Sequence, residues 1–587
     1  MKKRILSVIL IGVIFLSYLF VPINIVAETN KETLLSKCEK SKIKYYYVNQ
    51  ETSCVVETED DKEFKDDLIL NDKVSVLFEL SCITPICNCR DRITKDSTLE
   101  EVEQARSNHK EEMKEFFHLL NEKFVELNEI EINSEEYDIT IAEYAPYIMM
   151  TFDDYSEYLD CETQIIAISD NDIVNSVSVS ETVEYPSANR ENVNDSSYYN
   201  MYFVKRDIDA LSQTYNGNGI KVGIIEAEGV AYSSSHSDLE NLNITVNKPS
   251  GVNMDEASHA IKVTRVLCGE NGIAPGVRNV YIYYSNTPSS MVNALEWMVE
   301  KDVNIINISK ETDGWQGLYN WTGALLDFYV RTYFFTCVAS AGNEGSQGIS
   351  NYGMGENVIT VAATNMSNNI ATFSAYGMAE SINLRKPTLA APGVNIAIGT
   401  DDIGSGTSFS APIVAGVVAK LMDEDPFLIL YPEAVTASLI VSATSVNGQN
   451  NAWDIDAGAG RISYEKAREA VGNCIVFSNR NNSIGIIESE RIAVSANERL
   501  KVAAVWLANS ETEGAGDSVC SNNHTNYDLH LMGVNITRSV FDSNRSTNTE
   551  YINIYNTSTA TFDINILQRA AIVSGEEDVG AFTWITE

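Results

Sequence analysis

The stretch of this chain that carries most information is GTSFSAP, residues 406–412, together with the apolar run IVAGVVA that follows it at residues 413–419. Small and hydroxyl-bearing residues lead directly into apolar residues spaced i and i+4, a pattern that predicts a helix starting next to Ser408. Pro412 falls early enough in this helix for its missing N–H to cost little. Ser408 would then lie at a helix N-terminus, where backbone N–H groups and the helix dipole stabilise negative charge. A serine that attacks a carbonyl group benefits from this position.

A nucleophilic serine needs a general base, and the chain has only six histidines to supply one. Four of them lie outside the block of sequence that contains Ser408: His109, His118, His524 and His530. The two remaining candidates are His236, in a polar loop, and His259, at the start of a segment with helical spacing that ends before Ala274-Pro275-Gly276.

Four sequence blocks in the order acid, histidine, asparagine, serine make the chain resemble the subtilisin-like serine proteases (subtilases) over roughly residues 200–470. The GTSFSAP block is similar to the family's serine motif, which implies that Ser408 is the nucleophile. The block SAGNEG at residues 340–345 resembles the family's asparagine loop, which implies that Asn343 donates a hydrogen bond to the oxyanion. His259 stands where the family has its catalytic histidine, and the other candidate corresponds to a non-catalytic one.

The acid block departs from the family pattern. The strand expected at residues 220–225 leads to Glu226, where the resemblance implies an aspartate. A glutamate can orient the imidazole if the backbone retreats by about one C–C bond, roughly 1.5 Å. Glu228 is the alternative acid, because counting back from the loop with His236 places it nearer the expected position. A third alternative is that neither acid is competent and that the chain is an inactive relative.

The strand expected at residues 305–309 resembles the family strand that leads to the peptide-binding edge. The resemblance implies that Ser309, Lys310 and Glu311 contact the substrate. Lys310 and Glu311 stand where glycines would let a substrate backbone approach, so pocket shape and residue preference do not follow from the sequence. Backbone pairing with an extended substrate remains available.

The chain begins with features of an exported protein. Residues 1–27 combine a basic start, an apolar run and a small residue before the expected cleavage, which predicts a secretory signal peptide. An uncleaved membrane anchor is the alternative. We expect a secreted protein, extracellular or associated with the cell surface, that contacts a membrane only through the signal segment. A net charge of −40 argues against nucleic-acid binding.

Residues 71–182 resemble the subtilase propeptide in the order of their expected elements, β-α-β-β-α-β. These elements are expected at residues 74–80, 98–124, 130–141, 147–152, 154–159 and 174–179. The resemblance implies that this propeptide assists folding and acts as an intramolecular inhibitor, so that the enzyme is made as a zymogen. Residues 28–70 form a polar segment without clear periodicity, and residues 183–200 form a linker suited to cleavage.

Residues 473–587 contain short expected strands that are separated by loops rich in Asn, Ser and Gly. These strands are expected at residues 500–506, 527–531, 551–555 and 562–566. The pattern predicts a β-sandwich. The strand with Trp506, followed by the strand with Asp528, resembles the jelly-roll-like C-terminal domain of some subtilases.

The positions of the ten cysteines do not indicate a cofactor. Export permits disulfides, but their pairing does not follow from the sequence. Cys82, Cys87 and Cys89 lack a second pair of Cys or His ligands at the spacing of a zinc site. The protease chemistry itself requires no cofactor. The resemblance implies structural calcium, although no loop of this chain demands it.

The sequence therefore predicts an α/β fold with a doubly wound, largely parallel sheet at residues 201–472, between a propeptide-like α+β domain and a C-terminal β-sandwich. The predicted function is a secreted serine endopeptidase that hydrolyses peptide or protein substrates. Its predicted catalytic groups are Ser408, His259, Glu226 and Asn343. Two alternatives stay open: a catalytically inactive subtilase fold used for binding, and a protease that cleaves only itself.

Overall fold

The computed structural model describes the chain in segments. These are residues 43–49, 54–58, 73–80, 88–132, 134, 137–171, 173–181, 199–226, 237–248, 258–285, 287–310, 317, 319–377, 384–398, 403–449, 452–479, 484–508, 527–542, 547–569 and 578–587. The predicted signal peptide, most of the linker, Glu228, His236 and Glu311 lie outside the described residues. No helix in the described segments is both long enough and apolar enough to cross a membrane.

The centre of the molecule is a seven-stranded sheet in which every neighbouring pair of strands is parallel. In spatial order its strands are β14 (Leu389–Pro392), β13 (Ile359–Thr364), β12 (Thr336–Ser340), β11 (Ile305–Ile308), β8 (Lys221–Glu226), β10 (Asn279–Tyr284) and β9 (Asn243–Asn247). Strands β9 and β10 lie on one side of β8, and β11 to β14 lie on the other, so the strand order reverses at β8. In open sheets of this kind, ligands bind beyond the carboxyl ends of the strands at such a reversal point.

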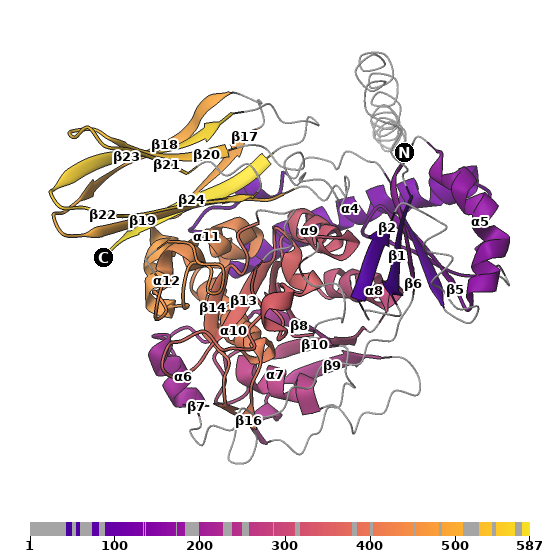
Figure 1. Ribbon diagram of the computed structural model, residues 1–587, viewed down its shortest axis with the longest axis horizontal. Coiled ribbons are helices and arrows are strands. Elements are labelled where there is room, and N and C mark those ends of the chain that lie inside the picture. The colour runs from indigo at the N-terminus through magenta and orange to yellow at the C-terminus, as the bar shows by residue number, and fades with distance from the viewer. Residues whose placement is uncertain are drawn as a thin grey trace, which may run out of the picture.

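Helices cover both faces of this sheet, as Figure 1 shows. One face carries α7 (Ser258–Cys268) and α10 (Thr407–Glu424), and the other carries α8 (Pro288–Glu300) and α9 (Trp321–Tyr333). The side chains of β8 alternate between the two layers: Val222 and Ile224 join the core under α7 and α10, and Ile225 joins the core under α8 and α9. This arrangement confirms the predicted α/β fold with a largely parallel sheet.

Shorter elements complete the central region. They are β7 (Tyr199–Asn200), α6 (Met201–Asp207), β15 (Ile396–Ala397), β16 (Ile403–Gly404), η6 (Pro426–Leu430), α11 (Pro432–Ser442) and α12 (Tyr464–Gly472). The strands β16, β15 and β7 form a small sheet of their own.

The N-terminal region forms a six-stranded sheet with a core of its own. In spatial order its strands are β2 (Cys54–Thr58), β1 (Ile43–Asn49), β6 (Val174–Glu181), β3 (Val74–Leu80), β5 (Tyr147–Phe152) and β4 (Asp138–Ile141). Two helices belong to this region, α4 (Leu99–Leu127) and α5 (Tyr155–Ser169). Side chains from both helices, such as Phe124 and Tyr158, are buried in the core on this sheet.

Three features of the N-terminal region differ from the sequence prediction. The segment at residues 28–70 contributes β1 and β2, which extend the sheet by pairing with each other and with β6. The strand expected at residues 130–141 is only the four-residue β4, because Glu129 adopts a left-handed φ of 53° at the end of α4 and a turn follows. The short helix expected at residues 154–159 or a little beyond is the longer α5, which continues to Ser169.

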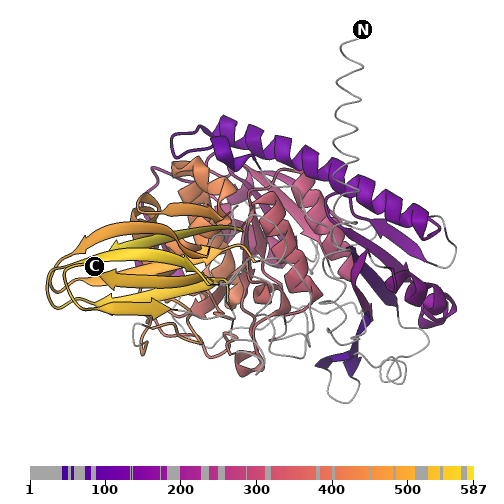
Figure 2. The same ribbon diagram turned by 90° about the horizontal axis from the view of Figure 1, so that it is seen from above.

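Helix α4 is 29 residues long, so it spans about 43 Å at 1.5 Å per residue. Thr98 and Glu101 form a capping box at its start, each side chain accepting a backbone N–H of the other residue. Figure 2 shows this helix, in purple, running from the six-stranded sheet across the central region. A short helical turn, η1 (Arg90–Arg92), precedes it.

The C-terminal region consists of two four-stranded sheets, each with only antiparallel pairs. The first contains β17 (Ile475–Asn479), β24 (Asp578–Thr586), β19 (Arg499–Trp506) and β22 (Thr549–Tyr555). The second contains β18 (Gly485–Val494), β23 (Ala560–Gln568), β20 (Tyr527–Gly533) and β21 (Ser539–Asp542). Side chains from both sheets, among them Trp506 and Tyr527, share one core at the yellow end of the molecule (Figure 1).

Candidate active site

Glu226 is the last residue of β8, and its side chain is buried. Because β8 lies between β10 and β11 at the reversal of strand order, this carboxyl group lies at the carboxyl edge of the sheet. The backbone N–H of Ser285, just after β10, donates to the carbonyl oxygen of Glu226 at 2.7 Å. The strand end that carries the carboxyl group is therefore held on a neighbouring strand.

His259 is the second residue of α7 and faces Glu226. Its Nδ1 lies 3.2 Å from Oε1 and 3.1 Å from Oε2 of the Glu226 carboxylate. The imidazole side chain is 18% exposed and the carboxylate side chain is 2% exposed, so solvent reaches the pair from the imidazole side. A proton on Nδ1, donated to the carboxylate, leaves Nε2 as the proton acceptor on that side.

Ser408 is the second residue of α10, and its neighbours fix its surroundings. Gly406, just before the helix, has φ +150°, a conformation that residues with a Cβ rarely adopt. The ring of Phe409 packs edge-to-face on the ring of His259, with centroids 5.9 Å apart. Thr407, on the other side, is hydrogen-bonded to Asn343. Ser408 therefore follows a residue that is bonded to Asn343 and precedes one that packs on His259.

Asn343 follows β12, and its amide has a fixed orientation. Its Oδ1 accepts hydrogen bonds from the backbone N–H of Thr407 at 2.9 Å and from the Thr407 hydroxyl at 3.1 Å. The Thr407 hydroxyl oxygen also accepts the backbone N–H of Gly342 at 3.1 Å. With Oδ1 occupied in this way, the amide nitrogen Nδ2 is the group that Asn343 can offer to a developing oxyanion.

Ser309 ties the end of β11 to the start of α10. Its hydroxyl donates to the backbone carbonyl oxygen of Ser408 at 3.0 Å and accepts from Nδ2 of Asn307 at 2.8 Å. The candidate residues Glu226, His259, Asn343, Ser408 and Ser309 are therefore brought together at one edge of the sheet.

The side chain of Lys310 turns into the protein, away from the role expected for it in contacting substrate. It is buried, and its Nζ donates to the carbonyl oxygen of Ser285 at 2.5 Å and to the Ser285 hydroxyl at 3.1 Å. Its Nζ also lies 4.8 Å from the ring centroid of Tyr352. Burial lowers the pKa of Lys310 to about 7, and the nearby charge of Glu226 partly counteracts this. The side chain of Lys310 is therefore engaged in the interior of the protein.

Two groups at this site were not identified from the sequence. The Thr407 hydroxyl positions Asn343, and the Phe409 ring packs on His259. Both residues flank Ser408 in the GTSFSAP block, so their position next to the nucleophile was the available signal. The burial of Lys310 had no such signal, because its partner Ser285 is 25 residues away in the chain.

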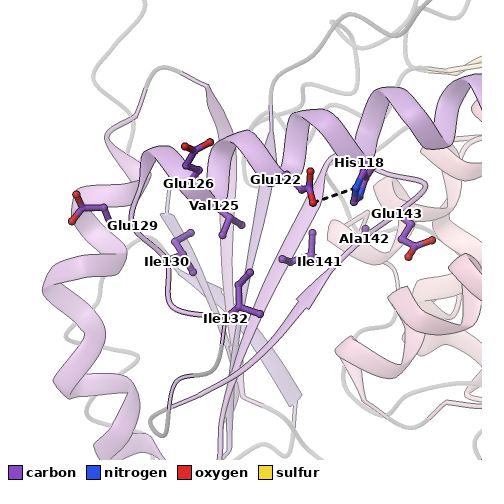
Figure 3. A pocket seen from close by; sticks show the side chains of 10 residues that line it. All are labelled: His118, Glu122, Val125, Glu126, Glu129, Ile130, Ile132, Ile141, Ala142 and Glu143. Carbon is purple, nitrogen blue, oxygen red and sulfur yellow. Dashed lines mark ion pairs between the residues drawn. The ribbon is translucent and has the colours of Figure 1, made fainter.

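A separate cleft of about 670 Å³ lies in the N-terminal region, between α4 and β4 (Figure 3). Apolar side chains, glutamates and one histidine line it: His118, Glu122, Val125, Glu126, Glu129, Ile130, Ile132, Ile141, Ala142 and Glu143. Nε2 of His118 lies 3.2 Å from Oε1 of Glu122. None of the candidate catalytic residues contributes to this cleft.

Metal binding gains no support from the described part of the chain. Within those segments, no three His, Cys, Asp or Glu side chains converge as a metal site would require. Cys161, Cys268, Cys337 and Cys474 are buried and form no disulfide bond, whereas Cys89 is disulfide-bonded.

Several known proteins are similar to this chain. Residues 162–460 match the model of the subtilase family. Subtilisin DY from Bacillus licheniformis is 28% identical over 293 residues, which cover 46% of this chain and 98% of that protein. Subtilisin NAT from Bacillus subtilis subsp. natto is 30% identical over 241 residues, which cover 37% of this chain and 58% of that relative. The solved structure of fervidolysin from Fervidobacterium pennivorans has a TM-score of 0.47 and 15% identity, covering 88% of this chain and 77% of that one.

Proposed function

The chain belongs to the subtilase family of serine endopeptidases, and from this premise we propose that Ser408, His259 and Glu226 form its catalytic triad. The observation that carries the proposal is the contact between Nδ1 of His259 and both carboxylate oxygens of Glu226 at 3.1–3.2 Å. A buried carboxylate in this position selects the imidazole tautomer that can accept a proton at Nε2. Glu226 takes the place that an aspartate has in the family pattern.

In the proposed reaction, Oγ of Ser408 attacks the carbonyl carbon of the scissile peptide bond while Nε2 of His259 takes the hydroxyl proton. The carboxylate of Glu226 stabilises the imidazolium. The carbonyl oxygen becomes an oxyanion, which accepts hydrogen bonds from Nδ2 of Asn343 and from the backbone N–H of Ser408.

Collapse of this intermediate breaks the C–N bond, and His259 returns its proton to the leaving amine. A water molecule then attacks the acyl group on Ser408 by the same route and releases the second product. Every proton in this sequence moves between groups of the chain, the substrate and water, so we propose no cofactor for the reaction.

The substrate is proposed to bind as an extended strand along the backbone that follows β11. Ser309 contributes by holding the backbone of Ser408 rather than by touching the substrate, since its hydroxyl is engaged by Ser408 and Asn307. Because the side chain of Lys310 is buried, its backbone groups serve as the pairing partners.

We further propose that the enzyme is exported and made as a zymogen. In this proposal, the six-stranded N-terminal sheet with α4 and α5 is the propeptide, and cleavage takes place in the linker at residues 183–200. The two C-terminal sheets form a β-sandwich. Support for the propeptide comes from the element order β3-α4-β4-β5-α5-β6, which is the order that the family resemblance implies.

One experiment separates this proposal from its alternatives. The purified full chain and its Ser408→Ala variant are compared for self-processing and for hydrolysis of casein. We expect both activities in the unaltered chain and neither in the variant. Self-processing without casein hydrolysis would favour a protease limited to itself, and the absence of both would favour an inactive binding protein.

A further inference from the structure

The N-terminal region holds a buried ion pair with a part of the chain 343 residues away. Nη1 of Arg90 lies 2.8 Å from Oε1 of Glu433, and Nη2 lies 3.4 Å from Oε2. The two side chains are 7% and 0% exposed. The guanidinium carbon of Arg90 also lies 4.1 Å from the ring centroid of Phe334 and 4.6 Å from that of Tyr431. Without Arg90, the buried Glu433 carboxylate would lose its ion-pair partner.

Helix α4 continues this contact along the central sheet. The guanidinium of Arg106 donates to the backbone carbonyl oxygens of Tyr333, Asp302 and Val303. Nε2 of His109 lies 2.9 Å from the carbonyl oxygen of Thr332. These carbonyl groups belong to the segments just before β11 and β12, so they depend on α4 for donors that water would otherwise supply.

Apolar side chains of α4 from Val102 to Phe117 are buried in the central cores. Val102 is fully buried in the core that also contains α7 and α10. Met113 and Phe117 are buried in the core that contains α8 and α9, where the rings of Phe117 and Phe328 lie edge-to-face with centroids 5.5 Å apart. We call residues 90–127, from η1 to the end of α4, the strap.

The strap crosses the edge of the sheet at which the strands begin. Asp302 and Val303 precede β11, and Tyr333 precedes β12. Leu99 packs closely on Gly219, before β8, where an added Cβ would lie 2.7 Å from Cδ2 of the leucine. Glu226 and Asn343 lie at the other end of these strands. The strap therefore occupies the edge of the sheet opposite the one that carries Glu226 and Asn343.

From these contacts we infer that the N-terminal region stays bound after the linker is cut, so that the working enzyme is a permanent non-covalent complex of two polypeptides. This inference rests on the proposed function only in assuming that the linker is cleaved. The strap completes the two cores and the amino edge of the sheet. A propeptide that is released would leave Phe334, Tyr431 and Glu433 uncovered, and the catalytic part would lose its fold with them.

The test uses an engineered cut, so it does not depend on the enzyme's own activity. A recognition sequence for a site-specific protease is placed between residues 183 and 198 of the full-length Ser408→Ala chain. After cleavage at this site, the sample is diluted to nanomolar concentration and passed over a sizing column. We expect the two polypeptides to elute together and to unfold in one thermal transition. Separation into two species, with residues 199–587 still folded, would overturn the inference.

Variants of the strap then test which contact holds the complex. In the cut protein, Arg90→Met should raise the dissociation rate at least about ten-fold, because it leaves Glu433 buried and unpaired. Arg90→Met combined with Glu433→Met should restore slow dissociation. Lys73→Met is the matched control, since it removes the exposed ion pair with Asp153 from the same region. An Arg90→Met protein that dissociates no faster than this control would show that the ion pair does not hold the complex.

The same cut applied to the chain with Ser408 intact separates this inference from the proposed function. Peptide hydrolysis in the fraction that contains both polypeptides supports both ideas. Co-elution without hydrolysis retains the permanent complex and counts against the proposed triad. Hydrolysis by residues 199–587 alone retains the triad and refutes the permanent complex.

Discussion

Nζ of Lys310 lies 2.5 Å from the carbonyl oxygen of Ser285. The backbone N–H of Ser285 in turn donates to the carbonyl oxygen of Glu226. A buried ammonium group is thus joined through one residue to the strand end that carries the proposed catalytic acid. The consequences of this arrangement can be measured in the stability of the protein.

Lys310→Met should alter the pH dependence of stability. Burial lowers the pKa of Lys310 to about 7 in the folded protein, whereas an unfolded lysine titrates near about 10.4. Between these values the unfolded chain binds more protons, so this group makes the free energy of unfolding increase with pH. The stability of the methionine variant relative to the parent should therefore fall by up to about 4 kcal/mol from pH 7 to pH 10.

Denaturant unfolding in a Ser408→Ala background, which prevents self-digestion, measures this difference. Lys123→Met, a change on the exposed face of α4, serves as the control. Parallel pH curves for Lys310→Met and its parent would contradict the expected titration of Lys310.

Glu226→Gln should lower kcat by about three to four orders of magnitude, because a neutral amide no longer selects the required tautomer of His259 or stabilises its charged form. Glu226→Asp withdraws the carboxylate by about 1.5 Å and should cost less, about 10- to 100-fold. Steady-state hydrolysis of a chromogenic peptide measures both. Glu228→Gln is the comparison; a large loss there, with Glu226→Gln nearly unaffected, would assign the acid to Glu228.

Asn343→Ala should reduce kcat by about 100- to 1000-fold with little change in KM, because the lost donor acts on the developing oxyanion. Thr407→Val removes the hydroxyl that holds Oδ1 of Asn343 and should reduce kcat by about ten-fold. Thr407→Ser keeps that hydroxyl and should restore most of the activity. Equal losses in the valine and serine variants would show that the hydroxyl does not position the amide.

Glu296→Gln should also change a pH profile, at the contact between α8 and the N-terminal region. The Glu296 carboxylate accepts the backbone N–H groups of Glu143 and Tyr144 and the hydroxyl of Tyr329. Burial nevertheless raises its pKa to about 7. The folded protein thus holds a proton that the unfolded chain loses above about pH 4.3, and the stability due to this group falls as pH rises toward 7.

The side chain introduced by Glu296→Gln does not titrate, so the variant escapes this loss of stability. Its free energy of unfolding relative to the parent should increase by about 2 kcal/mol from pH 4.5 to pH 7, a value reduced for partial exposure of the side chain. Thermal unfolding across this range is the measurement. Glu300→Gln, an exposed change on the same helix, is the control. A constant difference between Glu296→Gln and its parent would argue against a raised pKa.

The sequence was most informative where local pattern and chemistry coincide. The helix predicted next to Ser408 begins at Thr407, because Gly406 adopts a conformation that helices exclude and apolar i, i+4 spacing follows. The strand expected before Glu226 is also present. Its apolar run is buried between two layers of helices, as the local pattern predicts. The predicted parallel sheet follows from such runs alternating with helical segments.

Features that depend on distant partners could not be predicted in this way. Strand β1 lies in a polar segment, and its pairing with β6 joins residues more than 100 positions apart. The ion pair between Arg90 and Glu433 leaves no trace in either local sequence. The burial of Lys310 also leaves no local trace. A charged side chain predicts an exposed contact, but its partners Ser285 and Tyr352 lie in the interior.

The strap and the triad lie at opposite ends of the same parallel strands, and this separation has an evolutionary consequence. Substitutions that retune substrate preference near the end of β11 leave Arg90, Arg106 and their partners untouched. Substitutions in the strap likewise do not alter Ser408 or His259. In this chain, substrate preference and the contacts of the strap can therefore change independently of each other.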